Sequence, residues 1–215
     1  MRLSAESLRL YAVTDRAWLK GRTLYDCVRE SISGGATTIQ LREKSLGYEE
    51  FKSQALEIQA LCREYHVPFI INDNVNLAVD VNSDGVHVGQ DDMSASNVRE
   101  IIGAGKILGV SVRTAEEAIL AERNGADYLG AGAVFHTGSK SDAVDISHTA
   151  LREICESVKI PVVAIGGISA KNIHLLAGSG IEGVAVVSAI FAQNDIRGAA
   201  RELLGLSEKY FAHES

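Results

Sequence analysis

The sequence predicts a (β/α)8 barrel, the TIM-barrel fold, formed by residues 1–215 as a single domain. Short apolar runs typical of buried parallel strands recur along the chain with helix-like segments between them, and nearly every run ends in glycine or polar residues. Residues that follow the strands of such a barrel meet at one mouth, so this placement indicates an enzyme. The runs are YAVTD, TIQLREK, FIIND, GVHVGQDD, ILGVS, YLGAGAVFHTGSK, VVAIGGI and GVAVVSAI.

Helices are expected between these runs. Residues 22–34 and 48–64 carry apolar side chains at helical spacing, and the second stripe is the stronger. Further helices are expected at 116–124, 149–157 and 170–179. Pro68 and Pro161 each directly precede a strand run, where a missing N–H is tolerated. The regular strand–helix repeat favours a closed barrel over an open doubly wound sheet, which the pattern leaves possible.

Composition argues against two classes of partner. The chain is 46% hydrophobic and 23% charged, with a formal net charge of −7. Nucleic acid and anionic membranes are both held by clustered lysine and arginine, so neither is expected here. The N-terminus lacks a signal-peptide pattern and no apolar run has the length of a membrane span, so we expect a cytoplasmic protein. Cys27, Cys62 and Cys155 show no metal or redox spacing and are expected to be buried apolar side chains.

The last two strand runs end in patterns that suit a phosphate. At Gly166-Gly167 the missing side chains let backbone N–H groups approach an anion, and Val187-Ser188 adds N–H groups and a hydroxyl. In barrels of this kind a phosphate commonly binds between the loops after strands seven and eight. The alternative is a pair of tight turns with no ligand.

Two pairs of residues with oxygen-bearing side chains end the third and fourth runs. Asn72-Asp73 and Asp91-Asp92 would face the mouth from adjacent strands and offer oxygen ligands. Mg²⁺ takes one or two protein carboxylates and completes its shell with water and substrate phosphate oxygens, so the pattern suggests one magnesium ion. The alternative is that each aspartate caps the helix that follows it.

Cations are expected beside these carboxylates. Gln40, Arg42 and Lys44 lie at every second position near the end of the second run, so their side chains can point the same way. Lys140 ends the sixth run. Together they describe a site for a polyanion held partly through a metal, with surface salt bridges as the alternative for each residue taken alone.

These motifs, in this order, resemble the thiamine phosphate synthase family. The matching segments are YAVTD, QLREK, IINDNVNLA, DGVHVGQDDM, GVS, DYLGAGAVFHTGSKSDA, VVAIGGI and GVAVVSAI, which extend from Tyr11 to Ile190. The resemblance implies a transferase of thiamine biosynthesis that joins aminomethylpyrimidine methyl diphosphate to hydroxyethylthiazole phosphate. Pyrophosphate would leave first, assisted by magnesium, and the thiazole nitrogen would then attack the pyrimidine cation. The implied partners are therefore small molecules, with a homo-oligomer left open.

The resemblance also implies residue roles. The pyrimidine diphosphate would contact Gln40, Leu41, Arg42, Glu43, Lys44, Asn72, Ser111 and Lys140, of which Arg42, Lys44, Ser111 and Lys140 would be catalytic. Asp73 and Asp92 would hold the magnesium ion. The thiazole phosphate would contact Thr137, Gly138, Ser139, Gly167, Val187 and Ser188.

One loop departs from the family pattern. Where the family usually has Phe-Pro-Thr-x-Thr-Lys, this chain has Phe-His-Thr-Gly-Ser-Lys at 135–140, so the fixed φ of proline is absent at His136 and Gly138 adds backbone freedom to the loop. His136 is expected to be a partly exposed loop residue rather than a base. Whether the 137–146 loop closes over ligands is left open. Two rival functions are a paralogous thiazole tautomerase and a non-catalytic sensor of a phosphate ligand, and the residues at 72–73, 92 and 140 argue against both.

Overall fold

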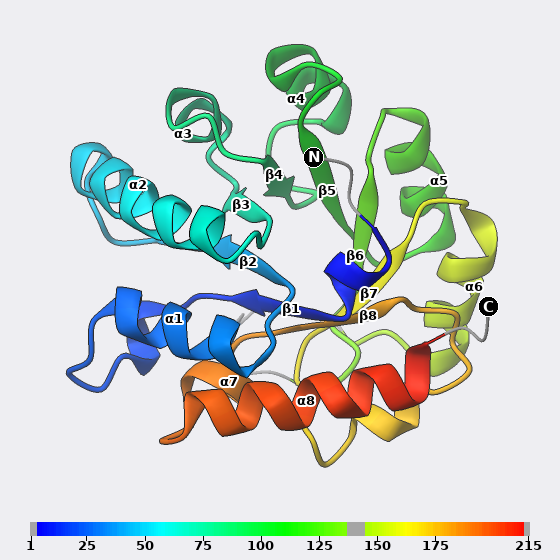
Figure 1. Cartoon of the computed structure of the whole chain (residues 1–215). Coiled ribbons are helices and arrows are strands. Elements are labelled where there is room, and N and C mark those ends of the chain that lie inside the picture. The colour runs from blue at the N-terminus through cyan, green and yellow to red at the C-terminus, as the bar shows by residue number, and fades with distance from the viewer. Residues whose placement is uncertain (1–3, 137–144, 213–215) are drawn as a thin grey trace.

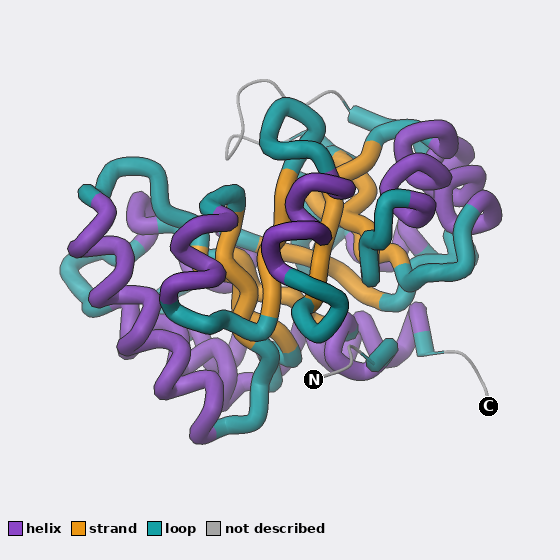
Figure 2. The backbone as a smooth tube through the Cα atoms, turned by 90° about the horizontal axis from the view of Figure 1, so that it is seen from above, coloured by secondary structure: helices purple, strands orange, loops and turns teal. Residues whose placement is uncertain are grey.

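The expected closed barrel is confirmed. The computed structural model describes residues 4–136 and 145–212. Within them the parallel strands β1 to β8 pair in sequence order, and β8 pairs with β1 to close the ring. Seen from above in Figure 2, the strands occupy the centre and the helices surround them. The carboxyl ends of the strands therefore converge at one end of the barrel.

The strands are short and lie in the order that the apolar runs predict. They are β1 (Leu10–Val13), β2 (Thr38–Leu41), β3 (Phe69–Asn72), β4 (Gly85–Val88), β5 (Ile107–Val112), β6 (Tyr128–Gly132), β7 (Val162–Ile165) and β8 (Gly183–Val186). The α-helices are α1 (Leu24–Gly34), α2 (Tyr48–Glu64), α3 (Val75–Asp80), α4 (Ala95–Ile102), α5 (Ala115–Arg123), α6 (His148–Ser157), α7 (Ser188–Phe191) and α8 (Ile196–Phe211). Three 3₁₀ turns complete the elements: η1 (Glu6–Leu8), η2 (Arg16–Trp18) and η3 (Ile173–Leu176).

The side chains of the strands form two cores, as alternation along a parallel barrel requires. The larger core fills the space between the strands and the helices. A smaller cluster lies inside the ring and is contributed mostly by residues that point inward from the strands. Two tyrosines, Tyr11 of β1 and Tyr128 of β6, belong to this inner cluster and are almost completely buried. The barrel interior is thus a packed core that contains hydroxyl groups.

The helices cover the outside of the ring. α1 and α8 lie side by side, at the bottom of Figure 1, so the first and last helices of the chain close the outer layer together. Gly34 of α1 permits this contact, because a Cβ there would overlap the backbone of α8 at Arg197. Cys27 and Cys62 are buried in this layer as expected, whereas Cys155 is half-buried.

The helix expected at 170–179 is wrong. The structure has only the 3₁₀ turn η3 in this segment. Asn172 explains the difference, because its side chain accepts a hydrogen bond from the Ser169 N–H (2.7 Å) and donates one to the Gly167 carbonyl (2.9 Å). These bonds hold a turn that precedes η3, and Gly178 with φ +77° follows it. The other expected helices are present within two residues of their predicted ends.

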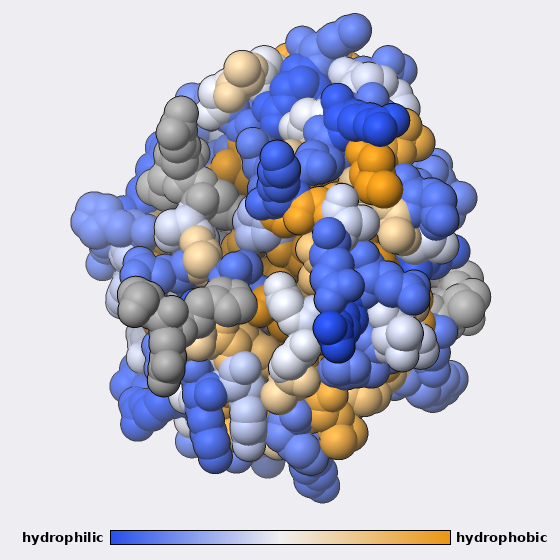
Figure 3. Space-filling model, turned by 90° about the vertical axis from the view of Figure 1, so that its right-hand side faces the viewer, coloured by the Kyte–Doolittle hydropathy of each residue, from blue (hydrophilic) through white to orange (hydrophobic). Residues whose placement is uncertain are grey.

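One face of the molecule is mostly polar at its surface. On the face shown in Figure 3, hydrophilic side chains predominate, with smaller hydrophobic areas between them. Among the described residues no helix has both the length and the apolar character needed to cross a bilayer.

Candidate active site

A cavity opens where the strands end, with about 1240 Å³ of empty space that includes open solvent. Its wall is contributed by all eight strands or the residues that follow them. Ten residues with expected site roles line it: Gln40, Arg42, Lys44, Asn72, Asp73, Asp92, Ser111, Gly167, Val187 and Ser188. The tertiary structure therefore gathers into one cavity residues that are up to 148 positions apart, from Gln40 to Ser188.

The remaining expected residues do not line this cavity among the described residues. Leu41 is completely buried in the outer core, so its side chain packs between strand and helices. The Glu43 carboxylate is turned into its own loop. Thr137, Gly138, Ser139 and Lys140 lie outside the described residues. His136, which precedes them, is exposed, as expected for a loop histidine.

The aspartates after β3 and β4 form a carboxylate pair. Asp73 has a left-handed backbone, with φ +61°. Burial and the neighbouring charge of Asp92 raise the pKa of Asp73 to about 6, and a hydrogen bond between the two side chains adds to this shift. Asp92 Oδ2 also accepts a hydrogen bond from the Gly89 N–H at 2.7 Å. Two carboxylates held this close would both be ionised most readily beside a cation.

These aspartates are not helix caps. The N-cap of α3 is Asn74, whose side chain accepts a hydrogen bond from the Leu77 N–H. The N-cap of α4 is Ser94, which accepts from the Asn97 N–H. The capping alternative is therefore wrong for Asp73 and Asp92. In the described part of the chain no cluster of three or more His, Cys, Asp or Glu residues could hold a metal.

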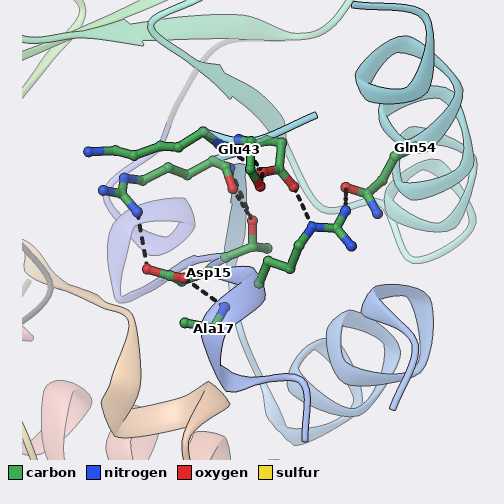
Figure 4. Close-up of polar contacts among 9 residues, drawn as sticks. Asp15, Ala17, Glu43 and Gln54 are labelled. Atoms are coloured by element: carbon green, nitrogen blue, oxygen red, sulfur yellow. Dashed lines mark hydrogen bonds and ion pairs between the residues drawn. The ribbon is translucent and has the colours of Figure 1, made fainter. Parts of the chain in front are cut away.

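Arg42 is positioned by the segment that follows β1. Asp15 Oδ2 lies 3.1 Å from Arg42 NH1, and its other oxygen accepts a hydrogen bond from the Ala17 N–H at 2.9 Å (Figure 4). The buried Thr14 hydroxyl oxygen accepts a hydrogen bond from the Arg42 N–H at 3.0 Å. The two strand ends are thus tied together, which holds the Arg42 guanidinium at the wall of the cavity.

The loop after β2 is folded around Glu43. Its Oε1 accepts hydrogen bonds from the Lys44 N–H (2.8 Å) and from the N–H and hydroxyl of Ser45 (both 2.9 Å), while Oε2 pairs with Arg16 at 2.8 Å (Figure 4). Although burial opposes ionisation, the hydrogen bonds from Ser45 and Arg16 lower the pKa of Glu43 to about 2. Glu43 therefore fixes the backbone of this loop. Its two neighbours in the chain, Arg42 and Lys44, both line the cavity.

The glycine pair after β7 fills a place where no side chain fits. Gly166 and Gly167 both have positive φ, at +101° and +64°. A Cβ on Gly167 would overlap the carbonyl oxygens of Phe135 and His136 in the segment after β6. Across this turn the cavity wall continues with Val187 and Ser188, where the short α7 begins. This part of the wall is made largely of backbone.

Three polar residues of the cavity were not singled out from the sequence. His87, Gln90 and Arg113 all line it. His87 is an inward position of β4, and alternation along that strand was the one signal that could have identified it. Gln90 Nε2 donates a hydrogen bond of 2.6 Å to the Ser111 carbonyl, and so links the residues that follow β4 to β5.

Comparison with known proteins identifies the family of this chain. Residues 10–190 match the family described as "Thiamine monophosphate synthase". The thiamine-phosphate synthase of Clostridium tetani is 50% identical over 196 residues, covering 91% of this chain and 94% of its own. That of Alkaliphilus oremlandii is 51% identical over 194 residues, covering 90% and 93%.

A solved structure extends the agreement to three dimensions. Thiamine phosphate pyrophosphorylase from Pyrococcus furiosus superposes with a TM-score of 0.89 at 42% identity, covering 97% of this chain and 99% of that one. A 3-hexulose-6-phosphate synthase at 18% identity and a TM-score of 0.65 shares the fold alone. The family match covers more than four-fifths of the chain, and the relative from Clostridium tetani is 50% identical in sequence. This chain therefore belongs to the thiamine monophosphate synthase family.

Proposed function

We propose that this enzyme transfers the aminomethylpyrimidine group from its methyl diphosphate to hydroxyethylthiazole phosphate, giving thiamine monophosphate and pyrophosphate. The observation that carries the proposal is the composition of one cavity. Carboxylates and cations that suit a diphosphate follow β2, β3 and β4, and a backbone-rich wall that suits a monophosphate follows β7 and β8. Two anionic substrates can therefore be held with their reacting ends between them.

The proposed order of bond changes follows from the chemistry of the pyrimidine. A 4-aminopyrimidine can stabilise positive charge on its exocyclic methylene, so the bond from this carbon to the diphosphate oxygen breaks first. The thiazole nitrogen then donates its electron pair to the methylene and forms the new carbon–nitrogen bond. Arg42 and Lys44 would stabilise the charge that develops on the leaving pyrophosphate. Lys140 is assigned the same role by the family resemblance.

The carboxylate pair fits a magnesium ion. Asp73 and Asp92 supply two oxygen ligands, which is the number that Mg²⁺ takes when a diphosphate and water complete its shell. When bound, the ion would neutralise charge on the diphosphate. The raised pKa of Asp73 supports this assignment. Burial and the charge of Asp92 disfavour a second negative charge at this place, and a bound cation would offset both effects.

Each substrate is assigned to one wall of the cavity. Gln40, Asn72 and Ser111 would hold the pyrimidine and its diphosphate together with Arg42 and Lys44. Gly167, Val187 and Ser188 would hold the thiazole phosphate through backbone N–H groups, joined by Thr137, Gly138 and Ser139 of the neighbouring loop.

Mass spectrometry of the reaction tests the proposal. The purified protein is mixed with both substrates and Mg²⁺, and thiamine monophosphate and pyrophosphate are expected in equal amounts. Controls omit each substrate in turn or add a chelator. A tautomerase or a sensor would leave both substrates uncondensed, so absence of thiamine monophosphate in the complete mixture would refute the proposal.

A further inference from the structure

A chain of hydrogen bonds crosses the interior of the barrel beneath the cavity. It begins at the cavity wall on β2, passes through the inner core and returns to the cavity wall on β5. In order, Gln40 Nε2 lies 2.9 Å from Tyr11 OH, Tyr11 OH lies 2.6 Å from Tyr128 OH, Tyr128 OH lies 2.8 Å from His87 Nδ1, and His87 Nε2 lies 2.9 Å from Ser111 Oγ. All but Ser111 are buried.

One direction of the chain gives every tyrosine proton an acceptor. The amide nitrogen of Gln40 can only donate, so the Tyr11 oxygen accepts from it. If Tyr128 donated to Tyr11 as well, the buried Tyr11 proton would have no acceptor among the described residues, so in this direction Tyr11 donates to Tyr128. Burial raises the pKa of both tyrosines far above neutrality, so each keeps one proton to donate. Tyr128 then donates to His87 Nδ1.

This direction decides the state of the histidine and of the serine. A His87 ring that accepts at Nδ1 is neutral and carries its proton on Nε2, which donates to Ser111 Oγ. Because that oxygen accepts from His87, the Ser111 hydroxyl proton points away from the ring. Ser111 lines the cavity, and Gln90 fixes its backbone through the carbonyl. Ser111 is thus set to donate into the cavity.

Two glycines leave room for this arrangement. A Cβ on Gly109 of β5 would overlap Tyr128 OH and His87 Nδ1, the two atoms that share a hydrogen bond. A Cβ on Gly130 of β6 would press on His87 Cε1 at 3.2 Å. β5 and β6 therefore each have a glycine next to the place where Tyr128 and His87 meet. A larger residue at Gly109 would displace the two atoms that form the hydrogen bond.

We propose that Tyr11, Tyr128 and His87 are positioning residues that set Ser111 as a hydrogen-bond donor to a ring nitrogen of the aminopyrimidine substrate. The inference rests on the proposed function. The ring nitrogens carry lone pairs and no hydrogens, so they need a donor, and a serine hydroxyl without this chain could equally present its oxygen. A donor at the ring also withdraws electron density that the methylene cation needs, so the effect of this bond is expected in substrate affinity.

The tautomer of His87 in the ligand-free protein is the first test. Nitrogen-15 NMR of histidine-labelled protein, at a pH where the ring is neutral, is expected to show a protonated Nε2 and an unprotonated Nδ1. The His87→Gln variant identifies the signal among the six histidines. A protonated Nδ1 would reverse the chain and overturn the proposal. This measurement needs no variant at Tyr128 and no substrate.

The second test is a double-mutant cycle on substrate affinity. Calorimetry with the pyrimidine diphosphate and Mg²⁺ is expected to show about tenfold weaker binding for Tyr128→Phe and for Ser111→Ala, the scale of one hydrogen bond. The double variant is expected to lose no more than Ser111→Ala alone, because Tyr128 acts through Ser111. The affinity for thiazole phosphate is expected to stay within twofold in all three variants, because that substrate is assigned to the opposite wall of the cavity.

A matched control is Tyr48→Phe, which removes another tyrosine hydroxyl bonded at 2.6 Å, here to Asp80 on the surface. It should leave binding unchanged. Losses from Tyr128→Phe and Ser111→Ala that multiply, or an unaltered affinity in Tyr128→Phe, would overturn the proposal. The two tests also separate this proposal from the proposed function. If wild-type protein shows the Nε2–H tautomer but binds no pyrimidine diphosphate, the direction of the chain is confirmed, whereas the proposed function and the identity of the acceptor are refuted.

Discussion

At the scale of single residues, Asp73 combines a backbone conformation that is uncommon outside glycine with a carboxylate whose ionised form is disfavoured. Its φ of +61° lies in the left-handed region, which aspartate tolerates better than most residues, and its pKa is raised to about 6. The folded protein therefore binds a proton at Asp73 more tightly than the unfolded chain, whose aspartates titrate near pH 3.9. Without a cation, stability should fall as pH rises from about 4 to about 6 and then level off.

Asp73→Asn is expected to remove this loss. The amide carries no charge, so the melting temperature of the variant should exceed that of the wild type above pH 6 and converge with it near pH 4. Circular dichroism melts in chelator across this range provide the measurement. Asp91→Asn, at an exposed carboxylate of the loop that contains Asp92, is the control and should run parallel to the wild type. A parallel curve for Asp73→Asn as well would contradict the raised pKa.

At the scale of elements, the loop after β2 depends on one carboxylate. Glu43→Gln would replace one acceptor oxygen by a donor and end the ion pair with Arg16. We expect Arg42 and Lys44 to lose their alignment, and kcat/KM for the pyrimidine diphosphate to fall about ten- to a hundredfold, as small misplacements of substrate-binding groups do. Glu57→Gln on the exposed side of α2 is the control. Equal kinetics in the two variants would mean that the loop keeps its shape without the carboxylate.

The turn after β7 makes a second prediction at this scale. Gly167→Ala would press against the Phe135 and His136 carbonyls, whereas Gly178→Ala, at φ +77°, would meet nothing within 4 Å. Both variants carry the strain of positive φ, so the difference between them isolates the contact. Thiazole-phosphate affinity should fall severalfold or more in Gly167→Ala alone, with pyrimidine-diphosphate affinity preserved. Separate titrations of the two ligands would contradict this assignment if both affinities fell together.

At the scale of the whole molecule, the barrel places the residues of the two proposed anion sites after different strands around a shared mouth. If Asp73 and Asp92 hold Mg²⁺ together with diphosphate oxygens, the metal should bind weakly alone and far more tightly with the pyrimidine diphosphate. By linkage, Mg²⁺ must strengthen diphosphate binding by the same factor. Calorimetry of each ligand with and without the other measures both factors.

The variants that remove the carboxylates complete this prediction. Asp73→Ala or Asp92→Ala should bring the coupling factor close to one while thiazole-phosphate binding stays nearly unchanged, because that phosphate is assigned to neutral backbone donors of Gly167 and Val187, which follow β7 and β8, whereas the carboxylates follow β3 and β4. Equal diphosphate affinities in Mg²⁺ and in chelator for the wild type would remove the magnesium ion from the proposed mechanism.

Local sequence was sufficient for the order of the strands, for four of the helices and for most of the cavity wall, whereas α3, α4, α7 and α8 had no predicted bounds. Apolar runs that end in polar residues predict where each strand stops, and a closed barrel then brings Asp73, Asp92, Gly167 and Ser188 to one mouth. Helix ends followed the same logic except at 170–179, where the side chain of Asn172 bonds to the preceding turn. A propensity pattern does not contain that competing bond.

Only the tertiary structure decided which partners these residues have. Tyr11 and Tyr128 share a hydrogen bond across 117 positions of the chain, and Asp15 reaches Arg42 across 27. His87 gives no local sign that it connects Tyr128 to Ser111, because its neighbours are set by strand register around the ring. The sequence by itself determined the barrel and the location of its mouth, since both depend on local periodicity. Closure of the barrel determined the hydrogen-bond partners and the raised pKa of Asp73, since both depend on groups that meet only when different strands are packed together.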